Sequence, residues 1–167
     1  MILSRSARMA VNGQRVVRLE FTSAVEMLDF VQIVSDHVGR TAGLDDDALH
    51  WVGVAVRESV INAIRHGNRN DESKRVFVEF HSAPAGEESA LTIFVRDQGE
   101  GFDPETVANP LEPDNLLKSS GRGIFLIRNF MDEVHLHRAA EGGMEVRMVK
   151  RLHPAESQAD PAPTSSS

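Results

Sequence analysis

Residues 58–68 read ESVINAIRHGN, a stretch that ends a long helical pattern with a polar pair and a glycine. At about 100° per residue, one side of the helix predicted over 46–66 collects the apolar residues Leu49, Val52, Val56, Val60 and Ala63. The acidic run 45–47 suits its start, because an Asp N-cap and further acids favour the positive end of the helix dipole. Gly67 and Asn68 end the pattern. We therefore predict a helix that is anchored on a core by one side.

Glu58 and Asn62 lie one turn apart in this predicted helix, so their side chains share a face. The carboxamide oxygen of Asn62 is a hard ligand that suits Mg²⁺. The carboxylate of Glu58 can polarise a hydroxyl group or a water molecule. Taken alone, the same pair is also typical of a solvated helix surface, and both interpretations stay open at this point.

A second motif, DQGEGFD at residues 97–103, follows the strand predicted over 90–96. A carboxylate at a strand end, here Asp97, can accept a hydrogen bond from an exocyclic amine such as that of adenine. Gly99 and Gly101 let the backbone approach a flat ligand closely, and Phe102 beside them can line the same pocket. A plain surface turn is the alternative. A calcium loop is excluded, because glycines fill its third and fifth positions and Ala108 its twelfth.

A third motif, Gly121-Arg122-Gly123, opens the helix predicted over 121–129. A glycine-rich helix start offers free N–H groups to phosphate, and Arg122 and Lys118 can add positive charge. Two glycines alone also fit a helix start without a ligand. Other nucleotide signatures are absent: there is no P-loop and no kinase H-R-D or D-F-G, and Leu126 stands where a dinucleotide fingerprint needs a small residue.

The order of predicted elements indicates the fold class. Strands are expected over 14–20, 75–81, 90–96, 133–138 and 144–152, and helices over 23–38, 46–66 and 121–129, with a short helix beginning at 103–105. This order favours an α+β, two-layer α/β sandwich, with helices packed on one face of a mixed, mostly antiparallel sheet. Five phenylalanines are expected in the core, namely Phe30, Phe77, Phe80, Phe94 and Phe125.

Composition limits the remaining possibilities. The chain has 167 residues, of which 41% are apolar, and its net charge is −7. The size fits one domain over 11–152, with a flexible N-terminus at 1–10 and a disordered Pro-, Ala- and Ser-rich tail at 153–167. The acidic balance argues against direct binding to nucleic acid or to an anionic membrane. The absence of cysteine excludes a disulfide framework and a thiolate metal site. With no secretory signal and no apolar run long enough to span a bilayer, a cytoplasmic protein is expected.

In this order and spacing, the three motifs resemble the N, G1 and G2 boxes of the GHKL (Bergerat-fold, HATPase_c) ATPase superfamily, over residues 54–131. Within it the chain resembles the bacterial anti-sigma-factor serine/threonine kinases, which share the style of ESVINAIRHGN, DQGEGFD and GRGIFLIRNFMDEV. Too few residues precede the N box for the phosphoacceptor helix pair of a sensor histidine kinase.

The resemblance implies a role for each motif. Glu58 would be the general base toward a serine or threonine hydroxyl, and Asn62 would ligate Mg²⁺, with His66 and Asn68 completing the N box. Asp97 would read the adenine amine. The residues expected to contact the nucleotide are then Asn62, His66, Asn68, Asp97, Gly99, Gly101, Phe102, Lys118, Gly121, Arg122, Gly123 and Ile124. Two departures are Ile124, where leucine is commoner, and Arg65, where a neutral residue is frequent.

The resemblance also implies a function: an ATP–Mg²⁺-dependent protein serine/threonine kinase and anti-sigma factor that binds a sigma factor and phosphorylates an anti-sigma-factor antagonist. Relatives of this kind commonly work as dimers, which makes a homodimer possible. Two alternatives stay open: a nucleotide-gated binding module that transfers no phosphate, and a histidine-kinase-like catalytic domain.

A histidine pair and the single tryptophan lie outside these motifs. His135 and His137 lie on one face of a predicted strand, so a metal pair is conceivable, but no third ligand is near in sequence. Trp51, early in the helix over 46–66, is expected to pack rather than to stack on a base, because the chain is acidic.

Overall fold

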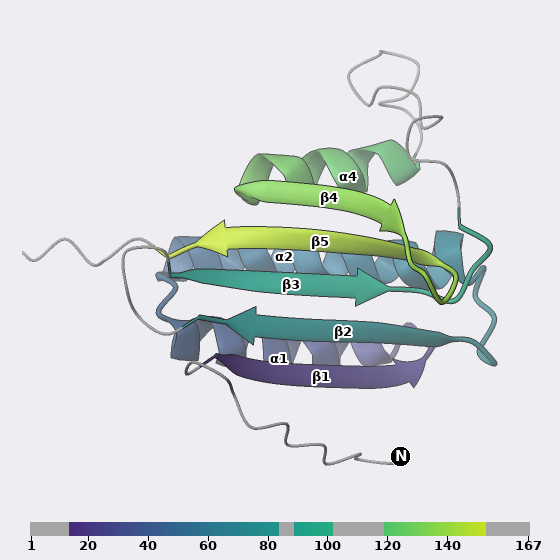
Figure 1. The fold of residues 1–167 in the computed structure, drawn as a ribbon, viewed down its shortest axis with the longest axis horizontal. Coiled ribbons are helices and arrows are strands. Elements are labelled where there is room, and N and C mark those ends of the chain that lie inside the picture. Colours follow the sequence, from purple (N-terminus) through teal and green to yellow (C-terminus); the bar gives the residue numbers. More distant parts are fainter. Residues whose placement is uncertain (1–13, 84–88, 102–118, 153–167) are drawn as a thin grey trace, which may run out of the picture.

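The computed structural model describes residues 14–83, 89–101 and 119–152 (Figure 1). Its elements, in chain order, are β1 (Arg15–Thr22), α1 (Met27–Ala42), α2 (Asp46–Asn62), the π-helical turn η2 (Ala63–Gly67), β2 (Arg75–Ser82), β3 (Ala90–Arg96), α4 (Ser119–Phe130), β4 (Glu133–Arg138) and β5 (Met144–Arg151). This is the predicted order, and the bounds of β3 and β4 agree with the prediction. The short helix expected at 103–105, the N-terminus and the tail lie outside the described residues.

The strands form one sheet in the order β1-β2-β3-β5-β4. Every pairing among these strands is antiparallel, so the described sheet is not mixed. The chain leaves β3, passes through α4 to β4 at the edge, and returns as β5 between β3 and β4. The end of β3 therefore lies beside the start of β5, and the segment after β3 comes close to the segment before β5.

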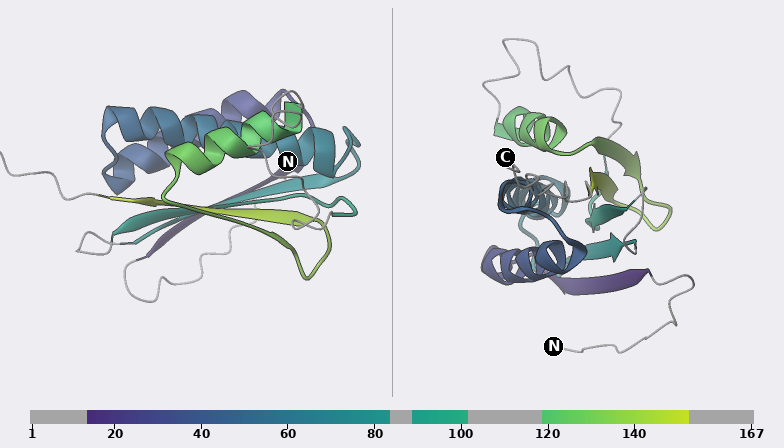
Figure 2. Two further views of the ribbon diagram at one scale, coloured as in Figure 1. Left: turned by 90° about the horizontal axis from the view of Figure 1, so that it is seen from above. Right: turned by 90° about the vertical axis from the view of Figure 1, so that its left-hand side faces the viewer.

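The three described helices all cover one face of the sheet, with α2 between α1 and α4 (Figure 2). The predicted two-layer α+β sandwich is therefore confirmed. All five apolar positions on the predicted inner side of α2 are buried, namely Leu49, Val52, Val56, Val60 and Ala63. Four of them, all except Leu49, belong to one apolar cluster with strand residues that include Val78, Phe80 and Ile93. This apolar layer holds α2 firmly on the sheet, so the polar side chains of α2 are presented from a rigid support.

The ends of α2 follow their local chemistry. The side chain of Asp45 accepts a hydrogen bond from the backbone N–H of Ala48 at 2.7 Å, which confirms the predicted N-cap. At the other end, the predicted helix over 46–66 changes to the wider π-helical turn η2 after Asn62. Such turns are rare and frequently occur at functional sites, because they re-aim the side chains around them.

The predicted start of the first helix at residue 23 is wrong, because α1 begins at Met27. Ser23 is instead buried and accepts a hydrogen bond from the side chain of Asn68, which holds it in the junction between β1 and α1. The helix also runs past the predicted end at residue 38. It stops at Gly43, whose φ of 97° is the left-handed conformation that glycine favours at a helix end.

Only one of the five phenylalanines predicted in the core is fully buried, namely Phe80. Phe30 is 48% exposed and Phe125 is 37% exposed. Each lies two residues, or about 200°, from a buried residue of its helix, so it points outward. Phe77 and Phe94 are half-buried on the face of the sheet that carries no helix, because successive strand residues alternate between the two faces.

No helix within the described ranges is both long and apolar enough to cross a bilayer.

Candidate functional site

The first and third motifs meet where the end of α2 faces the beginning of α4. A methyl group placed on Gly123 would lie 3.0 Å from Glu58 Oε2 and 3.1 Å from Asn62 Nδ2. Both side chains are half-buried, and neither forms a hydrogen bond or ion pair with any residue that the structure describes. A carboxylate and a carboxamide therefore converge on the first turns of a helix with their polar atoms available to a ligand.

The second motif supplies a fixed carboxylate. Asp97 follows β3 and is 5% exposed. Its Oδ1 accepts two backbone N–H groups, from Gly99 at 2.8 Å and from Met144 at 3.1 Å. Its Oδ2 lies against Gly67 and receives no hydrogen bond from the described part of the chain. Asp97 thus presents one oriented acceptor oxygen, which can bind an amine donor.

Three glycines make this arrangement possible by close backbone approach. A methyl group on Gly67 would lie 2.1 Å from Asp97 Oδ2, and one on Gly99 would lie 2.1 Å from the carbonyl oxygen of Gly67. Gly143 has a φ of +85°, and a methyl group there would lie 2.0 Å from the carbonyl oxygen of Asp97. The strands expected over 133–138 and 144–152 leave Gly143 in the connection between them, and the sequence does not indicate this contact. The two glycines differ only in their surroundings: a methyl group on Gly142 would meet nothing within 4 Å, whereas one on Gly143 would meet Asp97.

The side chain of Asn68 points into the protein rather than into the candidate site. Its side chain is fully buried, and its polar atoms bind Ser23, the carbonyl of Arg75 and the backbone N–H of Gln98. The expectation that Asn68 touches the nucleotide does not fit this arrangement, because a ligand would have to displace these protein partners.

The other predicted contact residues lie in η2, in the turn after β3 and in α4, or outside the described residues. His66 is exposed on η2, and Ile124 is half-buried on α4. Gly101, with a φ of +71°, has the side chain of Arg138 beside it: a methyl group on Gly101 would lie 3.2 Å from Arg138 Nε. Gly121 and Arg122 belong to α4, which begins two residues earlier than predicted, at Ser119. Gly121 still falls among the first backbone N–H groups, which have no partner within a helix. Phe102 and Lys118 lie outside the described residues.

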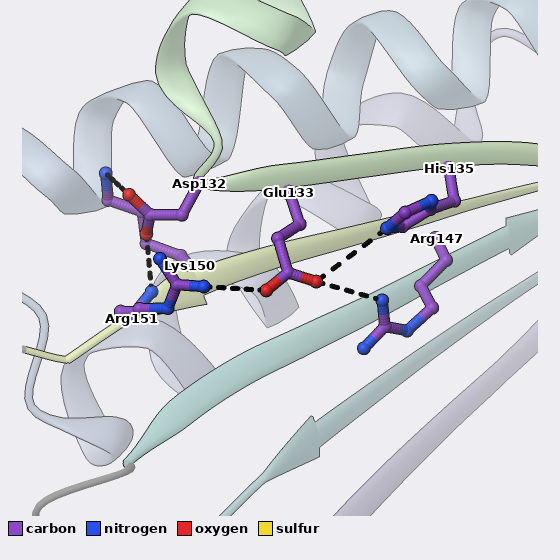
Figure 3. Close-up of polar contacts among 6 residues, drawn as sticks. All are labelled: Asp132, Glu133, His135, Arg147, Lys150 and Arg151. Carbon is purple, nitrogen blue, oxygen red and sulfur yellow. Dashed lines mark hydrogen bonds and ion pairs between the residues drawn. The ribbon is translucent and has the colours of Figure 1, made fainter.

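The histidine pair on β4 has ordinary ion-pair partners. His135 Nε2 lies 3.7 Å from Glu133 Oε2, and His137 Nε2 lies 3.2 Å from Glu145 Oε1. Figure 3 shows His135, Arg147 and Arg151 all pointing to the carboxylate of Glu133. No group of three or more residues in the described ranges could hold a metal through His, Cys, Asp or Glu side chains. The metal alternative is therefore not supported here.

A shallow hollow on the helix-free face of the sheet does not compete with this site. It is lined by Phe77, Glu79, His81, Phe94, Arg96 and Glu145. Its carboxylate Glu79 is already paired with His81 at 2.8 Å and with Arg18 at 2.9 Å. Burial acts to raise the pKa of Glu79, but these hydrogen bonds outweigh it, so the pKa lies below its ordinary value. The groups of this hollow stabilise one another and do not face α2 or α4.

Trp51 packs, as predicted. Its ring stacks on Phe130 at the end of α4, with ring centroids 3.7 Å apart. This contact joins the first half of α2 to the far end of α4, while Glu58 and Asn62 meet Gly123 near its beginning. The two helices are thus held together at both ends, which fixes the site between them.

The fold and the site together define an ATP-binding domain of the GHKL type, and comparison with known proteins gives the same answer. Residues 21–150 match the family model of the histidine kinase-like ATPase domain, and the chain belongs to this family. The matched range contains all three motifs. Its order of helices and strands is the order that the sequence predicts.

Curated relatives refine this assignment. The chain is 28% identical over 146 residues to the serine-protein kinase RsbW of Staphylococcus epidermidis. This alignment covers 83% of the present chain and 88% of the relative. It is 26% identical over 143 residues to the protein of the same name from Listeria innocua, covering 82% and 87%. The corresponding protein of Staphylococcus aureus strain JH9 is 26% identical over 142 residues, covering 81% and 86%. The resemblance to the serine kinase branch is confirmed.

Proposed function

We propose that this chain is an ATP- and Mg²⁺-dependent protein serine/threonine kinase and an anti-sigma factor, which binds a sigma factor and phosphorylates an anti-sigma-factor antagonist. The observation that carries the kinase assignment is the convergence of Glu58 and Asn62 on Gly123 in the first turns of α4. Its relatives, named serine-protein kinases, support the same choice. The sigma factor and the antagonist rest on the family resemblance.

The residues present fit a bound adenine nucleotide. Asp97 Oδ2 is an oriented acceptor for the adenine amine, and Gly67 carries no side chain that would strike this oxygen. When bound, ATP supplies the transferable phosphoryl group, and Mg²⁺ neutralises charge on the phosphate oxygens. The carboxamide oxygen of Asn62 would hold the metal ion, a hard cation that prefers oxygen ligands.

The remaining residues act on the phosphates and on the substrate. The N–H groups that open α4, together with Arg122, would bind phosphate oxygens, since a helix start attracts anions. Glu58 would accept the proton of the substrate hydroxyl while that oxygen attacks phosphorus. Because Glu58 is half-buried on a rigid helix and has no partner among the described side chains, it is free to make this contact.

The decisive experiment is phosphoryl transfer from labelled ATP to the antagonist-type domain encoded nearest to this gene. We expect acid-stable label on a serine or threonine of that domain. Acid-labile label would instead indicate histidine as the acceptor. Binding of Mg-ATP without any phosphoprotein would leave a nucleotide-gated binding module and contradict the kinase assignment.

Replacing Asp97 by asparagine should weaken ATP binding about 10- to 100-fold, the range expected for one charge-assisted hydrogen bond. The two N–H groups of Gly99 and Met144 would keep the amide oxygen in the Oδ1 position. The amide NH₂ group would then face the ligand amine, donor against donor. Isothermal titration calorimetry with Mg-ATP measures the change. Asp71→Asn, on an exposed turn, is the matched control, and equal affinities for the two variants would contradict the assignment.

Replacing Gly123 by alanine should lower the rate of phosphoryl transfer without lowering the stability of the protein. Glycine inside a helix costs up to about 1 kcal/mol relative to alanine, so the variant should be as stable as the wild type or more stable. Its methyl group would nevertheless crowd Glu58 and Asn62, 3.0–3.1 Å away, and lower the transfer rate about tenfold or more. Urea unfolding and a transfer assay measure the two effects. Arg128→Ala, exposed on the same helix, should change neither.

The homodimer stays a prediction. β1 is an edge strand of the described sheet, and Val16 and Val17 on it are 38% and 36% exposed. An edge strand with exposed valines can pair with a second copy.

A further inference from the structure

We propose that Asn68 is a positioning residue, which holds the Asp97 turn in its ATP-binding geometry and makes ATP affinity depend on Ser23, a residue outside the site. The inference rests on the proposed function, because it concerns how that nucleotide is bound. It assigns Asn68 a different role from the ligand contact that the sequence predicts.

Asn68 uses its side chain to join three separate parts of the chain. Its Nδ2 donates to Ser23 Oγ at 2.6 Å and to the carbonyl oxygen of Arg75 at 2.9 Å, and its Oδ1 accepts from the backbone N–H of Gln98 at 2.8 Å. Both donors of the carboxamide are therefore engaged, and the residue is fully buried. In a buried site, losing one such partner leaves a polar group unsatisfied, which makes the network sensitive to each member.

Gln98 makes a second hydrogen bond, through its side chain. Its Oε1 accepts from the backbone N–H of Arg75 at 2.7 Å, so its side chain binds the start of β2 while its backbone N–H binds Asn68. Gln98 is the residue directly after Asp97. Asn68 and Arg75 therefore hold the turn from one side, while the N–H of Met144 binds Asp97 Oδ1 from β5 on the other. The direction of Asp97 Oδ2 depends on both supports.

Ser23 is the distant member of this network. It is 3% exposed in the junction between β1 and α1, and its own N–H donates to the carbonyl of Lys74 at 3.1 Å. No described contact joins Ser23 to Asp97 directly. Among the described contacts, the hydroxyl of Ser23 bonds only the side chain of Asn68, so removing that hydroxyl should act on the Asp97 turn through Asn68. The geometry thus connects the ATP site to the start of the first helix.

The test replaces Ser23 by alanine in the full chain and measures Mg-ATP binding by calorimetry. We expect the Kd to rise about 3- to 10-fold, as the loss of one buried hydrogen bond allows. The KM for ATP should rise in parallel, with kcat at saturating ATP within about twofold of wild type. A purely structural role would instead lower the binding stoichiometry. Ser73→Ala is the matched control, because Ser73 bonds only Asp71 among the described side chains and does not touch the Asp97 turn.

A double-mutant cycle with Asn68→Ala tests the path. If Ser23 acts through Asn68, adding Ser23→Ala to Asn68→Ala should change the Kd by less than twofold. Unchanged affinity in a folded Ser23→Ala protein, or additive effects in the cycle, would overturn the inference and leave the proposed function intact. The affinity of the Ser23→Ala protein can overturn the inference without the cycle. The test therefore remains possible even if the Asn68→Ala protein fails to fold. A wild-type chain that binds no Mg-ATP would overturn the proposed function and the inference with it.

Discussion

Replacing Glu58 by alanine is expected to lower the rate of phosphoryl transfer by about 10²- to 10⁴-fold, the usual contribution of a positioned general base. The carboxylate lies near the first turns of α4, where a methyl group on Gly123 would be 3.0 Å from Oε2, and it has no protein partner among the described residues. No other carboxylate of the three motifs lies there within the part of the chain that the structure describes. ATP binding should change by less than about threefold, because the adenine contact is made by Asp97.

Two controls make the Glu58 result specific. Glu58→Gln keeps the shape and removes the base, so it should lose as much activity as alanine while staying as stable as wild type. Glu72→Gln removes a carboxylate from an exposed turn and should leave transfer unchanged. Single-turnover kinetics with saturating Mg-ATP measure the chemical step directly. Full activity in Glu58→Ala would reject Glu58 as the base.

Replacing Gly143 by alanine should abolish measurable ATP binding, a loss of at least about 100-fold. The methyl group would lie 2.0 Å from the carbonyl oxygen of Asp97 and 2.9 Å from its Oδ1. The first of these atoms is backbone and cannot rotate away, so β3 and β5 would have to separate where Met144 binds Asp97. The left-handed φ of +85° adds a cost of about 1–2 kcal/mol for any residue with a Cβ.

Gly142 provides the matched control for Gly143. It is adjacent in sequence and has a similar φ of +92°, but a methyl group there meets nothing within 4 Å. Gly142→Ala should therefore lower the free energy of unfolding by about 1–2 kcal/mol and leave the Kd for ATP within about twofold. Urea unfolding and calorimetry on both variants separate backbone strain from the contact with Asp97. Equal ATP binding by the two variants would show that the contact is unimportant.

Much of the fold could be predicted from the sequence because its signals are local. The apolar stripe of α2, its Asp45 cap and the bounds of β3 arise from residues close together in the chain, and the structure has all three where they were expected. The first helix was predicted less well. Its start shifted to Met27 because Ser23 is held by Asn68, 45 residues away, and no local pattern reports such a bond.

The site divides in the same way. The sequence by itself determined the candidate residues Glu58, Asn62 and Asp97, since they stand in motifs whose residue types and spacing indicate a nucleotide site. Only the tertiary structure decided which residues hold them in place. The backbone at Gly143 passes against Asp97, and the side chain of Asn68 is bound by Ser23, Arg75 and Gln98. Donors, acceptors and helix faces are properties of short segments, whereas close approach and burial arise only when distant segments pack together.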